Sequence, residues 1–532
     1  MRSRRAICVM ILALFLCVLQ TGAAHSQVAR TNDRDQQILQ IQQLIRDHSL
    51  AGARQQLAEA AKKYPADAGF DNLLGIVEAQ DDNYQVAEKT FLRAVERAPR
   101  FTGAYLNLGR LYQEHESVDP QARRKAFHVY ERVLDYEPKN AEAHYQSAAL
   151  LVQEGKYQES LAHLSHLPAE SQSRAQTLSI LCADYAGLDD RKRTEDAVAA
   201  LLPNPDFSDA DAQQALLGLA RGKRDDLIVL LLEGLQKREP LPADLLHALG
   251  LAYEATGKLA ESRTALEKSI NLESPTVPSL FELARVERKQ KDYEGSLGYL
   301  GHARDLEPRN AGIHYYFGLV CMDLNLLAEA RNSFEKAVQI EPENADYNYA
   351  MGVTSTLGHD PAEAVPYFER YLKLKPGDPR GKLALGAALF RAKEYDTAVP
   401  RLKEAAMIRE TATSAHYYLG AIALQERRLD EARSELEQAL KSKPDYTDAL
   451  AELGQYYLMQ KNYSQAEKHL RRALDLDPDH YSANFYLLTL YTRTGDTRQE
   501  AQSKRFDDLK KLLAEKMQEF LRVVEVRPLE TP

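Results

Sequence analysis

Seven small residues recur at a fixed interval between positions 250 and 454 of this chain of 532 residues. Each lies 34 positions after the one before it, and the series reads Gly250, Ala284, Gly318, Gly352, Gly386, Gly420 and Gly454. A strict period of this length is typical of repeat proteins, in which similar units stack on their neighbours. The period therefore predicts one extended solenoid rather than several independent globular domains.

Other positions of the period repeat as well. A second small residue follows twelve positions later (Ser262 to Ala466), and a large apolar residue comes four positions after that (Leu266 to Leu470). When the sequence is written in rows of 34 residues, proline stands at the end of five rows, at Pro308, Pro342, Pro376, Pro444 and Pro478. Small residues allow two helices to approach closely while a large apolar residue fills the space beside them, and proline ends a helix. The pattern predicts a pair of packed helices in each row.

With these columns the chain resembles the tetratricopeptide repeat family, whose period is 34 residues with an apolar–small pair, an alanine, an aromatic residue and a closing proline. The resemblance implies an all-α fold, a right-handed superhelical solenoid of helix–turn–helix repeats. One column differs, because the chain has no tryptophan and the family's tryptophan position holds Tyr105, His314, Asn348, His416 and Leu450.

The 34-residue frame covers most of the chain and predicts its organisation. The expected segments are a signal peptide at 1–26, a linker at 27–33, repeats 1–4 at 34–174, degenerate repeats 5–6 at 175–242, repeats 7–13 at 243–480, a partial repeat with a capping helix at 481–521, and a tail at 522–532. Repeat 3 carries five extra residues around Glu116 to Gln121. In the degenerate repeats Leu216 and Ile228 replace small residues, so we expect a bend or a looser joint there.

The two ends of the chain carry separate signals. Arg2, Arg4 and Arg5 precede a short apolar run and small residues, which is typical of a secretory signal peptide. We therefore expect an exported protein, periplasmic or extracellular, with no membrane span after cleavage; an uncleaved anchor is the alternative. At the other end, apolar residues at helical spacing predict a helix that caps the last repeat or, alternatively, binds a partner: Phe506, Leu509, Leu512, Leu513, Met517 and Phe520.

Charge and cysteine content narrow the function. The net charge of −10 argues against nucleic acid as the main ligand. Cys182 and Cys321 remain after signal cleavage, and both are expected to be small core residues, with an intermolecular disulfide as the alternative. His163 and His166 have metal-ligand spacing, but two histidines are too few for a structural zinc site. We expect no metal, no cofactor and no catalytic group.

In the family that this chain resembles, the first helix of each repeat lines a concave groove. The positions that would face such a groove are aromatic or apolar in the C-terminal half, with basic residues such as Arg285 among them. The predicted partner-binding residues are Phe281, Arg285, Tyr315, Leu319, Tyr349, Val353, Phe390, Tyr417, Leu424 and Phe485. The alternative is that neighbouring repeats bury this stripe.

Exposed aromatic residues at a regular spacing are typical of an interaction site. We therefore expect a scaffold or adaptor that binds protein or peptide partners along this surface. The alternative is a carbohydrate-binding component of an envelope polysaccharide export or assembly system, because sugar rings also stack on tyrosine and phenylalanine. Charge, repeat type and signal peptide do not separate these two classes.

Overall fold

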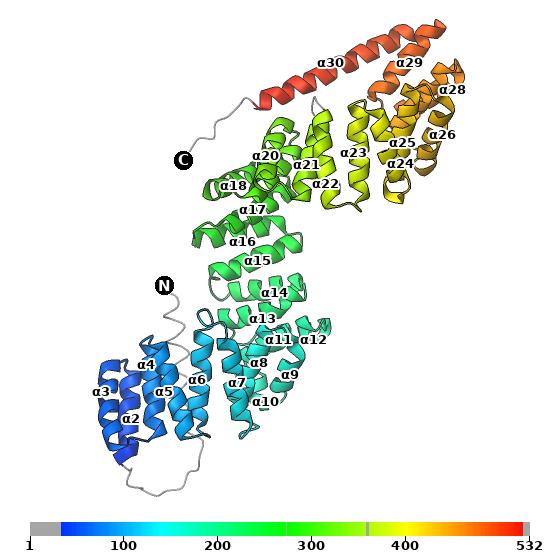
Figure 1. Ribbon diagram of the computed structural model, residues 1–532. Coiled ribbons are helices and arrows are strands. Elements are labelled where there is room, and N and C mark those ends of the chain that lie inside the picture. Colours follow the sequence, from blue (N-terminus) through cyan, green and yellow to red (C-terminus); the bar gives the residue numbers. More distant parts are fainter. Residues whose placement is uncertain (1–32, 273, 358–360, 525–532) are drawn as a thin grey trace. The chain divides into compact units, whose positions relative to one another are not determined.

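The computed structural model describes residues 33–272, 274–357 and 361–524, and these residues form a succession of helices (Figure 1). No β-strand occurs in those ranges. The predicted repeats correspond to successive pairs of helices, and the helices of a pair that lies within one compact unit pack against each other and against neighbouring pairs of that unit. The predicted all-helical solenoid of helix–turn–helix repeats is confirmed. The expected signal peptide at 1–26 and most of the linker lie outside the described residues.

The chain divides into two compact units, and the boundary falls between Lys258 and Leu259. In unit 1 the first helices of the repeats are α2 (Asp33–Arg46), α4 (Ala68–Gln80), α6 (Thr102–Glu114), α8 (Ala141–Gln153), α11 (Ala175–Gly187), α13 (Asp209–Arg221) and α15 (Ala243–Ala255). The second helices are α3 (Leu50–Lys63), α5 (Tyr84–Arg97), α7 (Ala122–Leu134), α9 (Tyr157–Leu164), α12 (Arg191–Leu201) and α14 (Asp225–Gln236). The short helix α10 (Ala169–Gln172) lies between α9 and α11.

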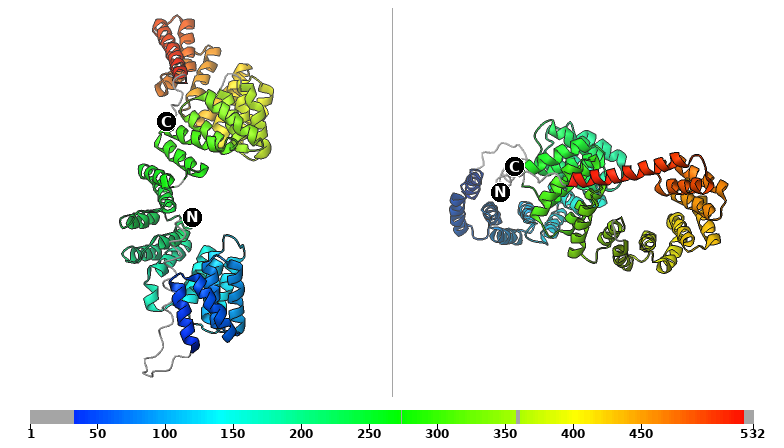
Figure 2. Two further views of the ribbon diagram at one scale, coloured as in Figure 1. Left: turned by 90° about the vertical axis from the view of Figure 1, so that its left-hand side faces the viewer. Right: turned by 90° about the horizontal axis from the view of Figure 1, so that it is seen from above.

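Unit 2 begins with α16 (Leu259–Leu272), and its yellow and orange helices follow a curved path (Figure 2, right). Its first helices are α17 (Val277–Gln290), α19 (Ala311–Asp323), α21 (Ala345–Leu357), α23 (Pro379–Arg391), α25 (Arg409–Gln425), α27 (Thr447–Met459) and α29 (Tyr481–Thr494). The second helices that follow α16 are α18 (Tyr293–Leu306), α20 (Leu327–Ile340), α22 (Val365–Leu374), α24 (Tyr395–Ala406), α26 (Leu429–Ser442), α28 (Tyr463–Leu476) and α30 (Gln499–Val524). The 3-10 helix η2 (Pro361–Ala364) leads into α22.

The small-residue column marks the point where the two helices of a repeat are closest. A Cβ atom added at Gly318 would lie 2.5 Å from the ring of Phe334, sixteen residues later in the second helix. The same relation joins Gly352 to Phe368 and Gly454 to Leu470. The glycines are therefore needed for packing, because a ring or a leucine side chain occupies the space that a Cβ would take.

A second recurring feature lies in the turn between the two helices of a repeat. A residue with a positive φ angle occurs there in most repeats, and it is glycine at Gly155 and Gly257 but a longer residue at Asn325, Lys393 and Lys461. This left-handed conformation costs a residue with a side chain more than it costs glycine. The turn between the two helices thus has this left-handed conformation even where the residue is not glycine.

The degenerate repeats 5 and 6 form the same helix pairs as the others, α11 with α12 and α13 with α14. Their first helices approach each other unusually closely, because a Cβ added at Gly218 would lie 1.9 Å from the backbone oxygen of Ala183. Gly218 is buried on α13, whereas Leu216 is only half-buried. Gly218 therefore brings the first helices of the two degenerate repeats close together. The bend or looser joint expected in this region stays a prediction.

The C-terminal helix α30 takes the place of a second helix in the last, partial repeat. Phe506 and Leu509 are buried, and the ring of Phe506 lies 5.1 Å from that of Tyr481. The first part of α30 thus packs on the last repeat, and the helix extends to Val524, beyond the expected end at residue 521. The side chains of Leu513, Met517 and Phe520 lie outside the described residues. None of the described helices combines the length and the apolar character that a membrane crossing requires.

The two cysteines of the repeats have the predicted core positions. Cys182 and Cys321 are unbonded thiols, buried on α11 and α19. Burial raises the pKa of each thiol to about 12, so both stay protonated and unreactive near neutral pH.

Candidate functional site

Five aromatic side chains form a stripe along the first helices of unit 2, at the fifth position of their rows. This aromatic stripe consists of Phe281 on α17, Tyr315 on α19, Tyr349 on α21, Tyr417 on α25 and Phe485 on α29. The first four are half-buried, and Phe485 is 46% exposed. All five therefore keep part of their surface accessible to solvent.

Each tyrosine of the stripe also packs against a neighbouring ring. The ring of Tyr315 lies 4.9 Å from that of Tyr347 on the next first helix. Tyr349 lies 5.0 Å from Tyr371, and Tyr417 lies 5.2 Å from Tyr446. Neighbouring elements thus cover one part of each ring and hold it in place while another part stays accessible. The expectation that neighbours bury the stripe applies only to the covered part.

The other predicted binding residues differ in their accessibility. Arg285, Leu319 and Val353 are half-buried on α17, α19 and α21. Phe390 on α23 is half-buried too, and its ring lies 5.4 Å from that of Tyr418 on α25. Leu424 is only 2% exposed. Its prediction as a groove residue needs correction, because it lies near the end of α25 and packs in a core cluster with Leu436 and Leu453.

Acidic and tyrosine side chains gather on α25, α27 and α29, beside the C-terminal part of the stripe. We call this set the acid–tyrosine cluster, and it consists of Tyr417, Tyr446, Asp448, Glu452 and Tyr486. The hydroxyl of Tyr486 lies 3.4 Å from Oε1 of Glu452 and 3.0 Å from Oε1 of Gln455. Sequence reasoning missed Glu452 and Tyr486, which occupy the sixth position of their rows, one residue after the column that was followed.

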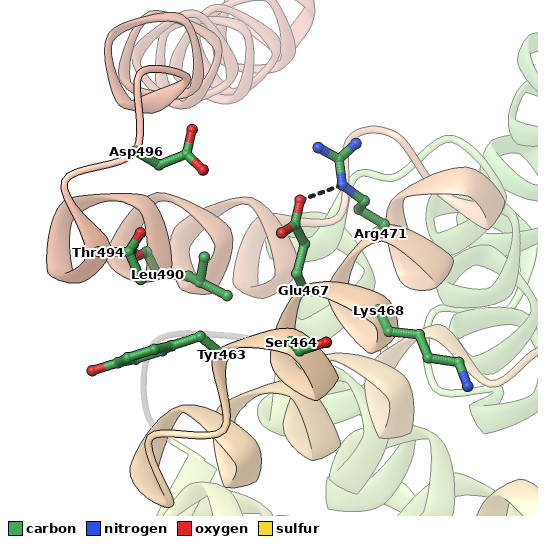
Figure 3. Close-up of a pocket in the computed structure, with 8 residues that line it drawn as sticks. All are labelled: Tyr463, Ser464, Glu467, Lys468, Arg471, Leu490, Thr494 and Asp496. Atoms are coloured by element: carbon green, nitrogen blue, oxygen red, sulfur yellow. Dashed lines mark hydrogen bonds and ion pairs between the residues drawn. The ribbon is translucent and has the colours of Figure 1, made fainter.

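A cavity of about 430 Å³ lies between α28, α29 and the residues that follow α29 (Figure 3). The Glu467 carboxylate in its lining is already paired, because it accepts hydrogen bonds from Arg471 at 2.7 Å and from Arg498 at 2.6 Å. The hydroxyl of Tyr491 lies 3.2 Å from the same carboxylate oxygen. This network stabilises the junction between the last repeats and leaves the Glu467 carboxylate fully occupied.

His163 and His166 lie next to a third histidine that the sequence did not reveal. Nδ1 of His163 lies 3.0 Å from Nδ1 of His144 on α8, and the rings of His144 and His166 stack 4.6 Å apart. Burial lowers the pKa of His163 to about 4, so the imidazole is neutral at pH 7. Among the described residues, no group of three or more histidine, cysteine or acidic side chains is arranged to hold a metal ion.

Comparison with known protein families decides the identity of the repeats. Three models described as tetratricopeptide repeat match the chain, one at residues 40–114, 281–345 and 358–415, a second at 121–180 and 423–489, and a third at 243–275. Together these segments cover more than half of the chain. The chain belongs to the tetratricopeptide repeat family. No curated protein matches it significantly.

Solved structures of other tetratricopeptide repeat proteins are similar to parts of the chain. YrrB, described as a protein with an unusual peptide-binding site, is 26% identical over 35% of this chain and 95% of its own, with a TM-score of 0.28. PilF from Pseudomonas aeruginosa is 21% identical over 41% of this chain and 97% of its own, with a TM-score of 0.34. Cut9 in the Cut9–Hcn1 complex is 14% identical over 86% of this chain and 96% of its own, with a TM-score of 0.34.

Tetratricopeptide repeat proteins generally mediate interactions between proteins, and the fold is typically non-catalytic. Membership of the family therefore favours protein or peptide partners for this chain, and nothing in it supports a polysaccharide ligand.

Proposed function

We propose that this tetratricopeptide repeat protein is an exported scaffold that binds peptide segments of protein partners along the aromatic stripe of unit 2. The observation that supports the proposal is the half-buried state of the stripe. A ring such as Tyr349, packed on one side against Tyr371, loses little conformational entropy when a ligand covers the rest of it. Rigid, partly accessible tyrosines are enriched among the residues that contribute most to protein binding.

A selection from a library of random linear peptides tests the binding role. The full chain is immobilised, and the enriched peptides are measured again with a variant that carries Tyr315→Leu, Tyr349→Leu and Tyr417→Leu. Leucine keeps apolar volume against the neighbouring rings, so the helical circular dichroism should persist, whereas peptide affinity should fall by about ten-fold or more.

A matched control replaces three tyrosines of second helices, Tyr367, Tyr395 and Tyr463, which are also half-buried. This control should bind the selected peptides as the unmodified chain does. If no peptide is enriched, or if the stripe variant binds as well as the control, the stripe is not the binding surface.

Export is proposed from the N-terminal residues, in which three arginines precede an apolar run. Expression of the full chain in a bacterial host, followed by cell fractionation and intact-mass measurement, tests it. We expect the protein outside the cytoplasm, with a mass that lacks the residues up to about Ser26. A full-length mass in the cytoplasmic fraction would contradict export.

A further inference from the structure

One carboxylate of the acid–tyrosine cluster has no cationic partner. Among the described residues, no lysine, arginine or histidine nitrogen lies within 4.0 Å of the Glu452 carboxylate, and its Oε2 atom is covered but makes no hydrogen bond. Most other half-buried acids of unit 2 differ in this respect; Asp378, for example, is paired with Arg380. A covered carboxylate without a positive partner is energetically costly, and the cost is relieved when a cation approaches.

The groups around Glu452 are suited to a cation. Asp448 lies one helical turn before it on α27, with a side chain that is 49% exposed and is bonded only to His480, at 3.1 Å. Burial raises the pKa of the Tyr417 hydroxyl, and the negative charges of Glu452 and Asp448 raise this pKa further.

Tyrosine rings complete this arrangement. Tyr417 and Tyr446 have their centroids 5.2 Å apart with the planes inclined by 47°, and both are half-buried. Aromatic faces next to carboxylates attract ammonium and guanidinium groups through the quadrupole of the ring. The cluster thus combines two acidic groups with ring faces at the edge of the aromatic stripe.

We infer that the acid–tyrosine cluster binds a cationic side chain, lysine or arginine, of the peptide segment that occupies the aromatic stripe. The inference rests on the proposed peptide-binding function and adds a specificity to it. The peptide would lay apolar groups on the stripe, and one basic side chain would reach the carboxylates of Asp448 and Glu452. Charge complementarity makes a basic side chain the natural occupant, since the uncompensated charge of the cluster is negative.

The peptide selection described above also tests this inference. Peptides enriched on the full chain should carry lysine or arginine at one preferred position, and replacing that residue by glutamine should weaken binding by about ten-fold or more. Glu452→Gln should remove the preference with little effect on folding, which circular dichroism and thermal unfolding would verify.

General attraction between basic peptides and an acidic protein needs a matched control. Asp430→Asn removes the same charge from the exposed second helix α26 and should leave the preference intact. If peptides are enriched without a basic position, or if Glu452→Gln and Asp430→Asn behave alike, the inference is wrong while the binding function stands. If no peptide is enriched at all, both proposals fail.

The pH dependence of binding gives an independent readout. Burial raises the pKa of Glu452 to about 7, and the titratable groups that face it are Asp448, His480, Tyr486 and Tyr417. A cation binds the ionised carboxylate, so a selected basic peptide should bind more tightly at about pH 8 than at about pH 6. The Glu452→Gln variant should lose most of this change. An unchanged pH profile in that variant would contradict the role of Glu452.

Discussion

Nε2 of His314 lies 3.0 Å from the carbonyl oxygen of Pro308, six residues earlier in the chain. Pro308 stands in the turn that leads into the next repeat, and His314 occupies the position where the family usually has tryptophan. The same relation recurs between His144 and Pro138, Asn348 and Pro342, and Asn484 and Pro478, with distances of 3.0, 2.8 and 3.0 Å. Histidine or asparagine in this column thus satisfies a backbone carbonyl of the turn between repeats.

We expect Asn348→Leu to destabilise unit 2. Asn348 is 1% exposed and its amide donates to the carbonyl oxygens of both Pro342 and Asn344, so leucine would leave the Pro342 carbonyl without this partner. The expected cost is about 1–3 kcal/mol, measured as a lower urea midpoint. Asn348→His, which copies the residue at His314, should recover most of the loss. Equal stability of the leucine variant and the unmodified chain would show that the bond contributes little.

The close contact between Gly318 and Phe334 predicts that a larger residue at position 318 lowers the stability of the fold. Gly318→Ala would place a Cβ atom 2.5 Å from the ring and should lower stability by about 1–3 kcal/mol. Adding Phe334→Leu should restore stability, because the repeat with Ala284 in this column has Leu300 opposite it. Gly301→Ala on α18 is the control, since nothing lies near its added Cβ and the variant should be neutral or stabilising. Thermal unfolding is measured for the unmodified chain, Gly318→Ala, Phe334→Leu and the double variant. Additive effects of the two substitutions on stability would show that the two residues do not interact.

The left-handed turn residues offer a way to stabilise the protein. Lys461 has a φ angle of 57° between α27 and α28, whereas the equivalent residue of an earlier repeat is Gly257. Lys461→Gly should raise stability by about 0.5–1 kcal/mol, because glycine adopts this conformation without a steric penalty. Lys443 has a φ angle of −137°, so Lys443→Gly should be neutral or destabilising. A gain for Lys443→Gly but not for Lys461→Gly would contradict the explanation.

Asp184 should make the stability of unit 1 depend on pH. Its side chain is fully buried and accepts a hydrogen bond from Ser160 at 2.7 Å, and burial raises the pKa of its carboxyl to about 8. A raised folded-state pKa means that the carboxyl favours folding below its unfolded value near 3.8, and that this contribution falls as pH rises toward 8. Asp184→Asn should therefore be more stable than the unmodified chain by about 2–4 kcal/mol at pH 8, with a smaller difference at pH 5.

Urea unfolding followed by circular dichroism at the two pH values measures this difference. Glu159, an exposed acid on α9, provides the control, and Glu159→Gln should show no comparable change with pH. A pH-independent difference for Asp184→Asn would indicate that the carboxyl is not strongly desolvated.

The helix pairs and their core could be predicted because they depend on local spacing. Small residues such as Gly318 and Gly454, with Phe334 and Leu470 sixteen positions later, are visible as columns once the period is recognised. The packing of the degenerate repeats 5 and 6 was harder to predict from the sequence. Gly218 packs against Ala183 of the preceding first helix, a contact that does not belong to the recurring small-residue positions, and only the tertiary structure reveals it.

The proposed binding surface was predicted less completely than the helix pairs. The sequence placed Tyr315, Tyr349 and Tyr417 in one column, and these residues do share a half-buried stripe. The sequence also predicted Leu424 as a groove residue, from another position of the row, although this residue near the end of α25 lies in the core. Columns alone do not show which neighbouring ring covers each position.

The sequence by itself determined the period, the repeat family, the pair of helices in each repeat and the glycine contacts within that pair. These features require only the order and size of residues along a helix. Tertiary structure decided which groups of different helices meet: His163 and His166 next to His144, the carbonyl of Pro308 next to His314, and Glu452 next to Tyr486 without a cationic partner. Such encounters depend on the rotation of each helix against its neighbours. Many side-chain contacts across the interface decide that rotation together, and no single column of the repeat encodes it.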